Sequence, residues 1–156
     1  MNLTFEPHTV PQVYDAYDED PELVALIRLC MAAEGNEDGD FNERAAYELD
    51  KLEASEVYVV RGDTARILGL LAVNVSERNE AKTLLIEAIA VDARLRDRKI
   101  GSKILHFAEI LALDHGCTSV QAYALDDDKV IGFYERQGYD KLSMHGAYVH
   151  MAKAIS

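Results

Sequence analysis

Four basic side chains crowd a short segment that lies between an apolar stretch and a helical pattern: Arg94, Arg96, Arg98 and Lys99. The helical pattern begins at Ile100. The first turn of an α-helix presents N–H groups without an acceptor in the helix, together with the positive end of the helix dipole, so a phosphate can bind there. Because that dipole disfavours cations, the clustered basic residues indicate an anionic ligand. The segment therefore predicts an anion site.

A single carboxylate, Glu87, interrupts the apolar stretch at residues 84–91. A central strand that is covered on both faces should be nearly all apolar, and a buried carboxylate is costly unless it is paired or used. Such a carboxylate can take a proton from an ammonium group, directly or through water. A cross-strand ion pair or a solvated edge position explains Glu87 equally well, and the residues alone leave both interpretations open.

The remaining reactive side chains give weaker signals. Cys30 and Cys117 are the only cysteines, and both lie among apolar residues, which predicts reduced thiols that pack in the core. His145 and His150, near the C-terminus, are further candidates for a base. No pair of His or Cys residues has both ligand spacing and partners, so no metal site is predicted.

The spacing of apolar residues predicts the elements that must position these groups. Three strands with short turns imply an antiparallel meander, and the strand–helix–strand connection that follows makes the strand after the helix parallel to the strand before it. The predicted order is a strand at 3–5, a helix that starts near Asp20 as N-cap, a helix at 41–54, strands at 57–60 and 67–75, a polar turn at 76–82, a strand at 84–91, a helix at 100–115, a strand at 118–125, a helix at 127–137, and strands at 139–144 and 147–154.

Length and composition bound the class of protein. At 156 residues the chain is most simply a single domain over residues 1–156, with enough length for one sizeable core. No apolar run approaches the roughly 20 residues that span a bilayer, and the N-terminus has no secretory signal. A cytoplasmic protein without a membrane partner is expected.

The net charge of −12 is distributed unevenly. The first 60 residues contain 15 acidic and three basic side chains, whereas the other 96 contain 13 of each. This distribution argues against nucleic acid as a partner, because phosphate binding needs a basic surface. It suits attraction of a cationic substrate, although the charge can also serve solubility alone.

The basic segment also resembles a known motif. The run from Arg96 to Gly101 is similar to the acyl-CoA motif of the GCN5-related N-acetyltransferases (GNAT), written (Gln/Arg)-x-x-Gly-x-(Gly/Ala). Arg96 fits the first position and Gly101 the last, while Lys99 stands where the middle glycine is usual and could contribute charge. The predicted element order is also the order of this family. The resemblance implies an α+β fold with a mixed, mostly antiparallel sheet of six or seven strands and about four helices.

A second segment, residues 133–139, looks like the family's Phe-Tyr-x-x-x-Gly-(Phe/Tyr) motif. By this resemblance Tyr134 is the general acid that returns a proton to the departing thiolate, since a phenol is protonated at neutral pH. The alternative is that Phe133 and Tyr134 only anchor the helix. Asp127 stands where the family often has an asparagine that binds the cofactor. An aspartate cannot donate as an amide does, and it can instead cap the helix.

The resemblance implies an acetyl-CoA-dependent N-acetyltransferase that moves an acetyl group directly to a primary amine of a cationic small molecule or peptide. Glu87 is the implied base, and the N–H groups of Ile89 or Val91 are the implied oxyanion donors. A non-catalytic CoA-binding or sensing domain is the alternative, and exposed C-terminal hairpin edges would permit a homodimer. The implied cofactor-binding residues are Ile89, Ala90, Val91, Arg96, Asp97, Arg98, Lys99, Ile100, Gly101, Ser102, Asp127 and Tyr134.

Overall fold

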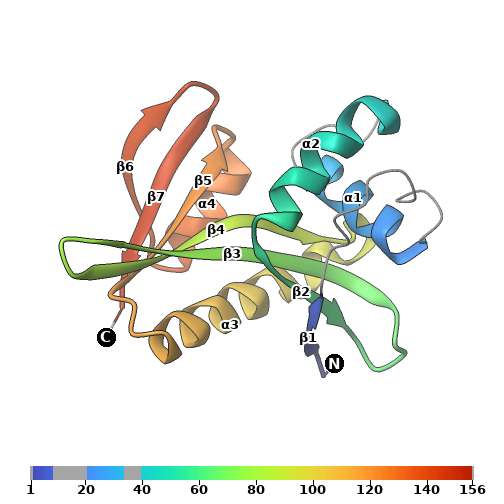
Figure 1. The fold of residues 1–156 in the computed structure, drawn as a ribbon, viewed down its shortest axis with the longest axis horizontal. Coiled ribbons are helices and arrows are strands. Elements are labelled where there is room, and N and C mark those ends of the chain that lie inside the picture. The colour runs from blue at the N-terminus through green and yellow to red at the C-terminus, as the bar shows by residue number, and fades with distance from the viewer. Residues whose placement is uncertain (1, 9–20, 34–39, 156) are drawn as a thin grey trace. The chain divides into compact units, whose positions relative to one another are not determined.

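The order of strands and helices is the predicted one (Figure 1). A computed structural model describes residues 2–8, 21–33 and 40–155, without the side chains of residues 42 and 96–98. The predicted cap Asp20 lies outside the described residues. The elements are β1 (Thr4–His8), α1 (Pro21–Ala33), α2 (Phe41–Glu53), β2 (Glu56–Arg61), β3 (Ile67–Arg78), β4 (Ala81–Val91), the 3₁₀ helix η2 (Ala93–Arg98), α3 (Ile100–Asp114), β5 (Ser119–Leu125), α4 (Asp128–Arg136), β6 (Asp140–His145) and β7 (Tyr148–Ala154).

Hydrogen bonds join seven strands in the order β1-β2-β3-β4-β5-β7-β6. The β4–β5 pair is parallel, as the strand–helix–strand connection predicts, whereas the β1–β2, β5–β7 and β6–β7 pairs are antiparallel. The predicted fold class, α+β with a mostly antiparallel sheet, is therefore confirmed. None of the described helices is long and apolar enough to cross a membrane.

The chain forms two compact units. The first comprises Met1–Ala72 and Ala88–Ile104, and the second comprises Val73–Glu87 and Leu105–Ser156. The strands β3 and β4 and the helix α3 each contribute residues to both units.

The core of the first unit packs α1 and α2 against β2, β3 and the end of β4. The inward face of α1 follows from its apolar spacing, which places five side chains on one side of the helix. The predicted core position of Cys30 is confirmed. The cluster comprises Leu23, Leu26, Ile27, Cys30, Met31, Ala45, Leu49, Leu52, Val57, Val59, Leu70, Ala72 and Ala90.

Arg61 joins three elements of the first unit through its guanidinium group. Its Nε donates to Glu6 Oε2 at 2.8 Å, and its Nη2 donates to Glu22 Oε1 at 2.6 Å. The two carboxylates raise the pKa of Arg61. This arginine therefore links the end of β2 to β1 and to the start of α1.

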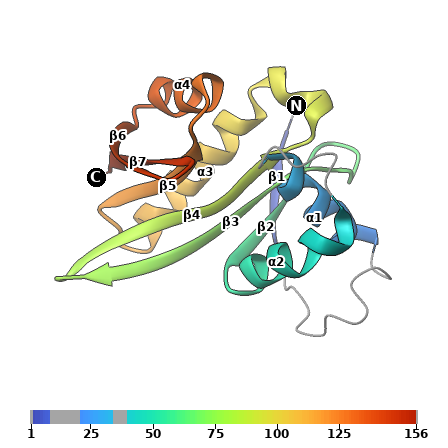
Figure 2. The same ribbon diagram turned by 90° about the horizontal axis from the view of Figure 1, so that it is seen from above.

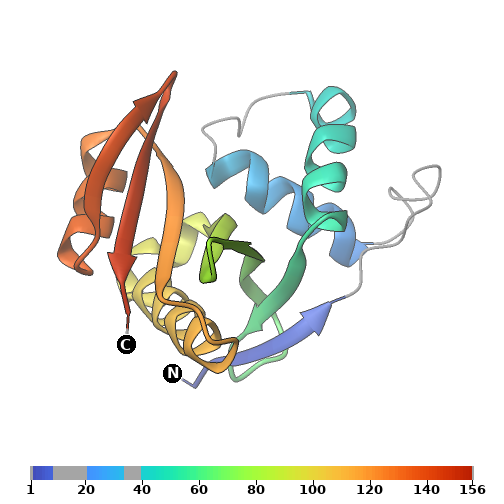
Figure 3. The ribbon, with the colours of Figure 1, turned by 60° about the vertical axis from the view of Figure 1, so that its left-hand side comes forward.

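The second unit places α3 and α4 on one side of its strands. Val120, Ala122 and Ala124 alternate along β5 and are buried. Lys153, which is in register with Val120, reaches Glu109 of α3. Figure 2 and Figure 3 show α4 against one side of β5, β7 and β6. The opposite side of these strands, termed the open face, carries the other residues of each alternation.

β6 lies at one end of the strand order, and all six of its residues are exposed. Its pairing with β7 shifts between Lys141 and Ser143, where a bulge or irregularity interrupts the register. β6 is therefore an edge strand whose ladder with β7 is interrupted at one point.

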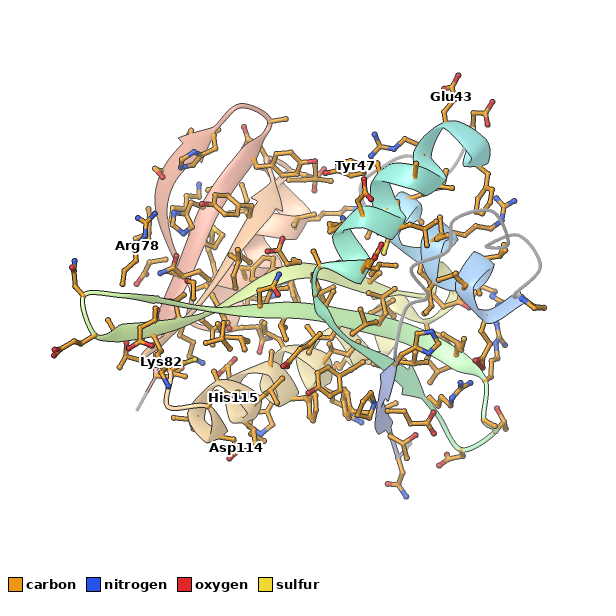
Figure 4. The ribbon with its side chains drawn as sticks, viewed as in Figure 1. Glu43, Tyr47, Arg78, Lys82, Asp114 and His115 are labelled. Atoms are coloured by element: carbon orange, nitrogen blue, oxygen red, sulfur yellow. The ribbon has the colours of Figure 1, made fainter. Side chains whose placement is uncertain are left out.

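The β3–β4 connection differs from the predicted polar turn at 76–82. The turn is only two residues long, Asn79 and Glu80, with φ of 52° and 69°. Positive φ at both central positions is what a tight hairpin turn with right-handed strand twist requires. Arg78 and Lys82 flank this turn, each within a strand (Figure 4).

Candidate active site

The segment after β4 in the first unit is organised by Asp92. Its N–H donates to the Leu68 carbonyl at 2.8 Å, which extends the contact between β3 and β4 by one residue. Its carboxylate caps η2 by accepting from the Arg94 N–H at 3.0 Å. The guanidinium groups of Arg94 and Arg66 bind the same carboxylate at 2.8 and 3.1 Å. The predicted cationic loop is therefore a capped 3₁₀ helix.

Lys99 connects η2 to α3 in the left-handed conformation, with φ 58° and ψ 21°. This geometry explains why a glycine is usual at the position, because a left-handed residue with a Cβ costs about 1–2 kcal/mol. The turn leads directly into the first turn of α3, where Ile100, Gly101 and Ser102 follow. The backbone of the predicted anion site is thus a left-handed turn followed by a helix N-terminus.

The other predicted cofactor-binding residues of the first unit lie at the end of β4 and in η2. Ile89 and Val91 are half-buried in β4, and Ala90 is buried in the core of the first unit. The backbone of Arg96, Asp97 and Arg98 forms the second half of η2. Their side chains lie outside the described part of the structure.

Gly69 of β3 fixes the position of the end of β4. A Cβ at Gly69 would lie 2.4 Å from the Ala90 carbonyl oxygen and 3.3 Å from Ile104 Cδ1. The backbone of β4 therefore approaches β3 more closely than any side chain permits. Sequence analysis missed this residue, although an isolated glycine in a strand pattern is a known sign of close backbone approach.

A cavity of about 600 Å³ opens in the first unit beside α1, the start of β3 and the start of η2. Four of its lining residues are arginines: Arg28, Arg61, Arg66 and Arg94. Arg94 also belongs to the basic segment. Two carboxylates, Glu22 and Asp92, also line the cavity and pair with Arg61, Arg66 and Arg94, so the cavity carries both charges beside η2.

In the second unit, Tyr134 of α4 is buried, with 4% of its surface exposed. Its ring packs edge-to-face on Phe133 and Tyr139, with centroid distances of 5.2 and 5.5 Å. Burial raises the pKa of its hydroxyl well above the ordinary value of 10. Among the residues that the structure describes, none accepts a hydrogen bond from this hydroxyl. Tyr134 is therefore a protonated donor at any physiological pH.

A second buried tyrosine, Tyr139, lies behind Tyr134. Its hydroxyl donates to Glu109 Oε2 at 3.3 Å, and Lys153 Nζ donates to Glu109 Oε1 at 2.7 Å. Burial raises the pKa of Tyr139, and the charge of Glu109 raises it further. These contacts join α3, β7 and the segment after α4, and they hold the Tyr134 ring from the side of α3.

Glu87 lies on the open face of the second unit. Leu85 is in register with Gln121, and two residues further along each strand come Glu87 and Tyr123, on the same face as that pair. Asn74 Nδ2 donates to Glu87 Oε1 at 3.2 Å. Glu87 is half-buried, and its side-chain hydrogen bond within β3–β4 is to an uncharged amide. Glu87 and Tyr134 therefore approach the second unit's strands from opposite faces.

The β4–β5 ladder covers only four pairs, from Thr83↔Ser119 to Ile86↔Ala122. Both strands continue beyond it, β4 to Val91 and β5 to Leu125. The ladder thus ends one residue before Glu87.

Asp127 caps α4. Its Oδ1 accepts from the Lys129 N–H at 2.9 Å and from the Val130 N–H at 3.3 Å. The capping interpretation of this residue is therefore confirmed, while its contact with a cofactor stays a prediction.

Three rings cluster on the open face, and sequence analysis did not bring them together. Tyr123 stacks on His150 with a centroid distance of 4.7 Å, and His145 meets Tyr123 edge-on at 5.4 Å. Tyr123 and His150 are cross-strand neighbours, so strand register was the only signal that could have found the pair. In the described part of the chain, no group of three or more His, Cys, Asp or Glu residues could hold a metal ion.

The chain resembles known proteins in sequence and in fold. The sequence model of a family described as "Acetyltransferase (GNAT) family" matches residues 10–139, whereas no curated protein matches the chain. The PaiA N-acetyltransferase of Thermoplasma acidophilum, solved with coenzyme A, is 15% identical with a TM-score of 0.69 over 99% of this chain and 100% of that one.

Two further solved structures are similar over nearly the whole chain. A GNAT-family acetyltransferase of Staphylococcus aureus Mu50 is 16% identical, with a TM-score of 0.68 over 99% of this chain and 100% of that one. A GNAT-family acetyltransferase of Elizabethkingia anophelis, solved with acetyl-CoA bound, is 15% identical, with a TM-score of 0.65 over 99% of both chains. At these identities the likeness shows the fold.

Proposed function

The chain belongs to the acetyltransferase (GNAT) family, and from that premise we propose that it transfers the acetyl group of acetyl-CoA directly to a primary amine. The observation that carries the proposal is the left-handed turn at Lys99 that leads into the first turn of α3. It aligns consecutive backbone N–H groups at a helix N-terminus, and such groups bind phosphate. The match of residues 96–101 to the family's acyl-CoA motif supports the same assignment.

The donor side of the proposed site uses backbone and charge. The first-turn amides at Ile100, Gly101 and Ser102 hold the pyrophosphate, and Arg94 and the other basic residues of the segment add positive charge. Acetyl-CoA supplies, when bound, an acetyl thioester. The N–H of Ile89 or Val91, on the part of β4 beyond the β4–β5 ladder, donates to the thioester carbonyl oxygen and stabilises the charge that develops there.

Glu87 and Tyr134 move the protons. An ammonium group has no lone pair, so Glu87 first takes one of its protons, directly or through water. The amine nitrogen then bonds to the acetyl carbon, and the carbon–sulfur bond breaks as the Tyr134 hydroxyl gives its proton to the sulfur. The nitrogen loses its second proton to water, which leaves a neutral amide, and the Tyr134 phenolate takes up a proton from water. The opposite faces of the two side chains suit this division, because base and acid act on opposite sides of the reacting carbon.

The test is Tyr134→Phe, with thiol release measured on a panel of primary amines. We expect kcat to fall about 100-fold, the lower range for a lost general acid, while the Kd for CoA stays within about twofold. Tyr139→Phe is the matched control: it removes the hydroxyl of a second buried tyrosine, which already donates to Glu109, and it should lower stability but not kcat. An unchanged rate in Tyr134→Phe would remove this residue from the mechanism.

A CoA-binding domain without catalytic activity is the second candidate. The lysine at position 99, where a glycine is usual, and Asp127, where an asparagine is frequent, favour it, because both residue types depart from the family pattern. Calorimetry with CoA, beside the amine panel, separates the two functions. Tight CoA binding without thiol release on any amine selects the second candidate, and measurable turnover selects the first.

A further inference from the structure

A row of side chains crosses the open face of the second unit, one from each of five neighbouring strands. Asn74 of β3 donates to Glu87 of β4, and Tyr123 of β5 follows Glu87 in the extension of the β4–β5 register. His150 of β7 is the direct partner of Tyr123, and Ser143 of β6 is the direct partner of His150. Glu87 and Tyr123 each follow the last β4–β5 pair, Ile86↔Ala122, by one residue, so the row carries a carboxylate on β4 and stacked rings on β5 and β7.

The rings of this row are held in place by their neighbours. His150 Nε2 is 2.6 Å from Gln121 Oε1, and His145 Nε2 is 2.9 Å from the Ser143 hydroxyl. The Tyr123 and His150 planes differ by 18° and are stacked. Tyr123 nevertheless keeps 47% of its surface exposed. The cluster is therefore a fixed, flat and accessible aromatic surface.

The charge of the row discriminates between amines. Burial and the neighbouring His145 lower the pKa of His150, so its ring is uncharged at neutral pH. Glu87 is then the one charged member of the row formed by Asn74, Glu87, Tyr123, His150 and Ser143. A second ammonium group, as in a polyamine, finds no carboxylate along the row. A flat ring, in contrast, stacks on Tyr123 with a gain of about 0.5–1.5 kcal/mol beyond its burial.

We propose that this row binds the acceptor of the reaction, and that the acceptor is a primary amine that carries a flat aromatic ring. The amino group lies at Glu87 and the ring lies on Tyr123. The assignment rests on the proposed transferase function and narrows its acceptor from primary amines in general to ring-bearing ones.

The experiment compares 2-phenylethylamine with 1,4-diaminobutane in the wild type, Tyr123→Leu and Tyr123→Phe. We expect Tyr123→Leu to lower kcat/KM for 2-phenylethylamine about 5- to 10-fold, the size of a lost aromatic pair, and to change kcat/KM for 1,4-diaminobutane less than twofold. Tyr123→Phe keeps the ring and should retain the preference for 2-phenylethylamine over 1,4-diaminobutane. The Kd for CoA, measured in each variant, shows that the fold and the donor side are intact.

A second measurement does not depend on turnover. Saturation-transfer NMR on the CoA-loaded protein should show contact with the ring protons of 2-phenylethylamine in the wild type and lose it in Tyr123→Leu. Equal kcat/KM losses for both amines, or ring contact that persists in Tyr123→Leu, would overturn the assignment and leave the transferase function standing. No thiol release with any amine would contradict the transferase function, while loss of ring contact in Tyr123→Leu would still support the row as a ring-binding surface.

Discussion

At the scale of single residues, Lys99 combines two effects that can be separated. Its backbone is left-handed, which a Cβ makes costly, and its exposed ammonium group adds charge beside the start of α3. Glycine removes both the cost and the charge, whereas alanine removes only the charge.

We therefore expect Lys99→Gly to be more stable than Lys99→Ala by about 0.5–1 kcal/mol, because the left-handed cost of alanine exceeds the extra chain entropy of glycine. Chemical denaturation of the two variants measures this difference. Both variants should weaken CoA binding about two- to fivefold at low salt and much less at high salt, since each loses one screened charge. CoA binding that is as strong as in the wild type at low salt would exclude a role for the charge.

The sequence alone identified Glu87 and Tyr134 as candidate site residues and Asp127 as a possible cap, because each has a local signal. Glu87 is a charge in an apolar strand, Tyr134 lies in a short motif, and Asp127 precedes a helix. The Tyr139–Glu109–Lys153 group could not be predicted in this way. Tyr139 and Lys153 lie 30 and 44 residues after Glu109 in the sequence, and only strand register and helix packing bring the three side chains together.

At the scale of elements, the contact between Gly69 and the Ala90 carbonyl connects strand packing to the donor site. The end of β4 leads through Asp92 into η2 and α3, so a shift of β4 displaces the whole segment that is proposed to bind CoA. The position of that segment therefore depends on a residue of β3 that carries no functional group.

Gly69→Ala should lower the free energy of unfolding by about 1–3 kcal/mol, since its Cβ meets a backbone oxygen that cannot turn away. It should also weaken CoA binding, as measured by calorimetry. Gly132→Ala in α4 is the matched control. Its Cβ meets only the end of the exposed Arg136 side chain at 3.1 Å, and alanine favours the helix by about 0.5–1 kcal/mol. A Gly69→Ala protein as stable as the wild type would show that β4 can move without cost.

The order of elements was predictable because hydrophobic periodicity is local and strong in this chain. The lengths of β3 and β4 could not be predicted, because residues 75–81 at the hairpin are exposed and carry no apolar pattern. Turn geometry at Asn79 and Glu80 decides where these strands end. Likewise, the basic residues after β4 predicted an anion site, but the 3₁₀ helix depends on the Asp92 cap.

At the scale of the whole molecule, the two buried tyrosines couple global stability to alkaline pH. Burial raises the pKa of Tyr134 and Tyr139, so the folded chain keeps both protons at a pH where the unfolded chain releases them. Their contribution to stability is complete below pH about 10, the pKa in the unfolded chain, and is lost as pH rises above that value.

The free energy of unfolding should fall above pH 10 by about 1.4 kcal/mol per pH unit for each tyrosine. Urea denaturation followed by circular dichroism between pH 8 and pH 11.5 measures this slope, with these values chosen as roughly one to two units on either side of the phenol pKa. Tyr134→Phe and Tyr139→Phe should each make the slope shallower, whereas replacement of the exposed Tyr47 by Phe should not. Identical slopes in all three variants would contradict the coupling.

The irregular pairing of β6 has a consequence for how copies of the chain meet. An exposed border strand is a template on which another chain can add a strand, and long regular borders promote aggregation. The register shift between Lys141 and Ser143 breaks that template within a strand of six residues, and the charges of Asp140 and Lys141 make strand addition there costly. The irregularity that interrupts the β6–β7 ladder therefore opposes the addition of a strand from another chain to the edge strand β6.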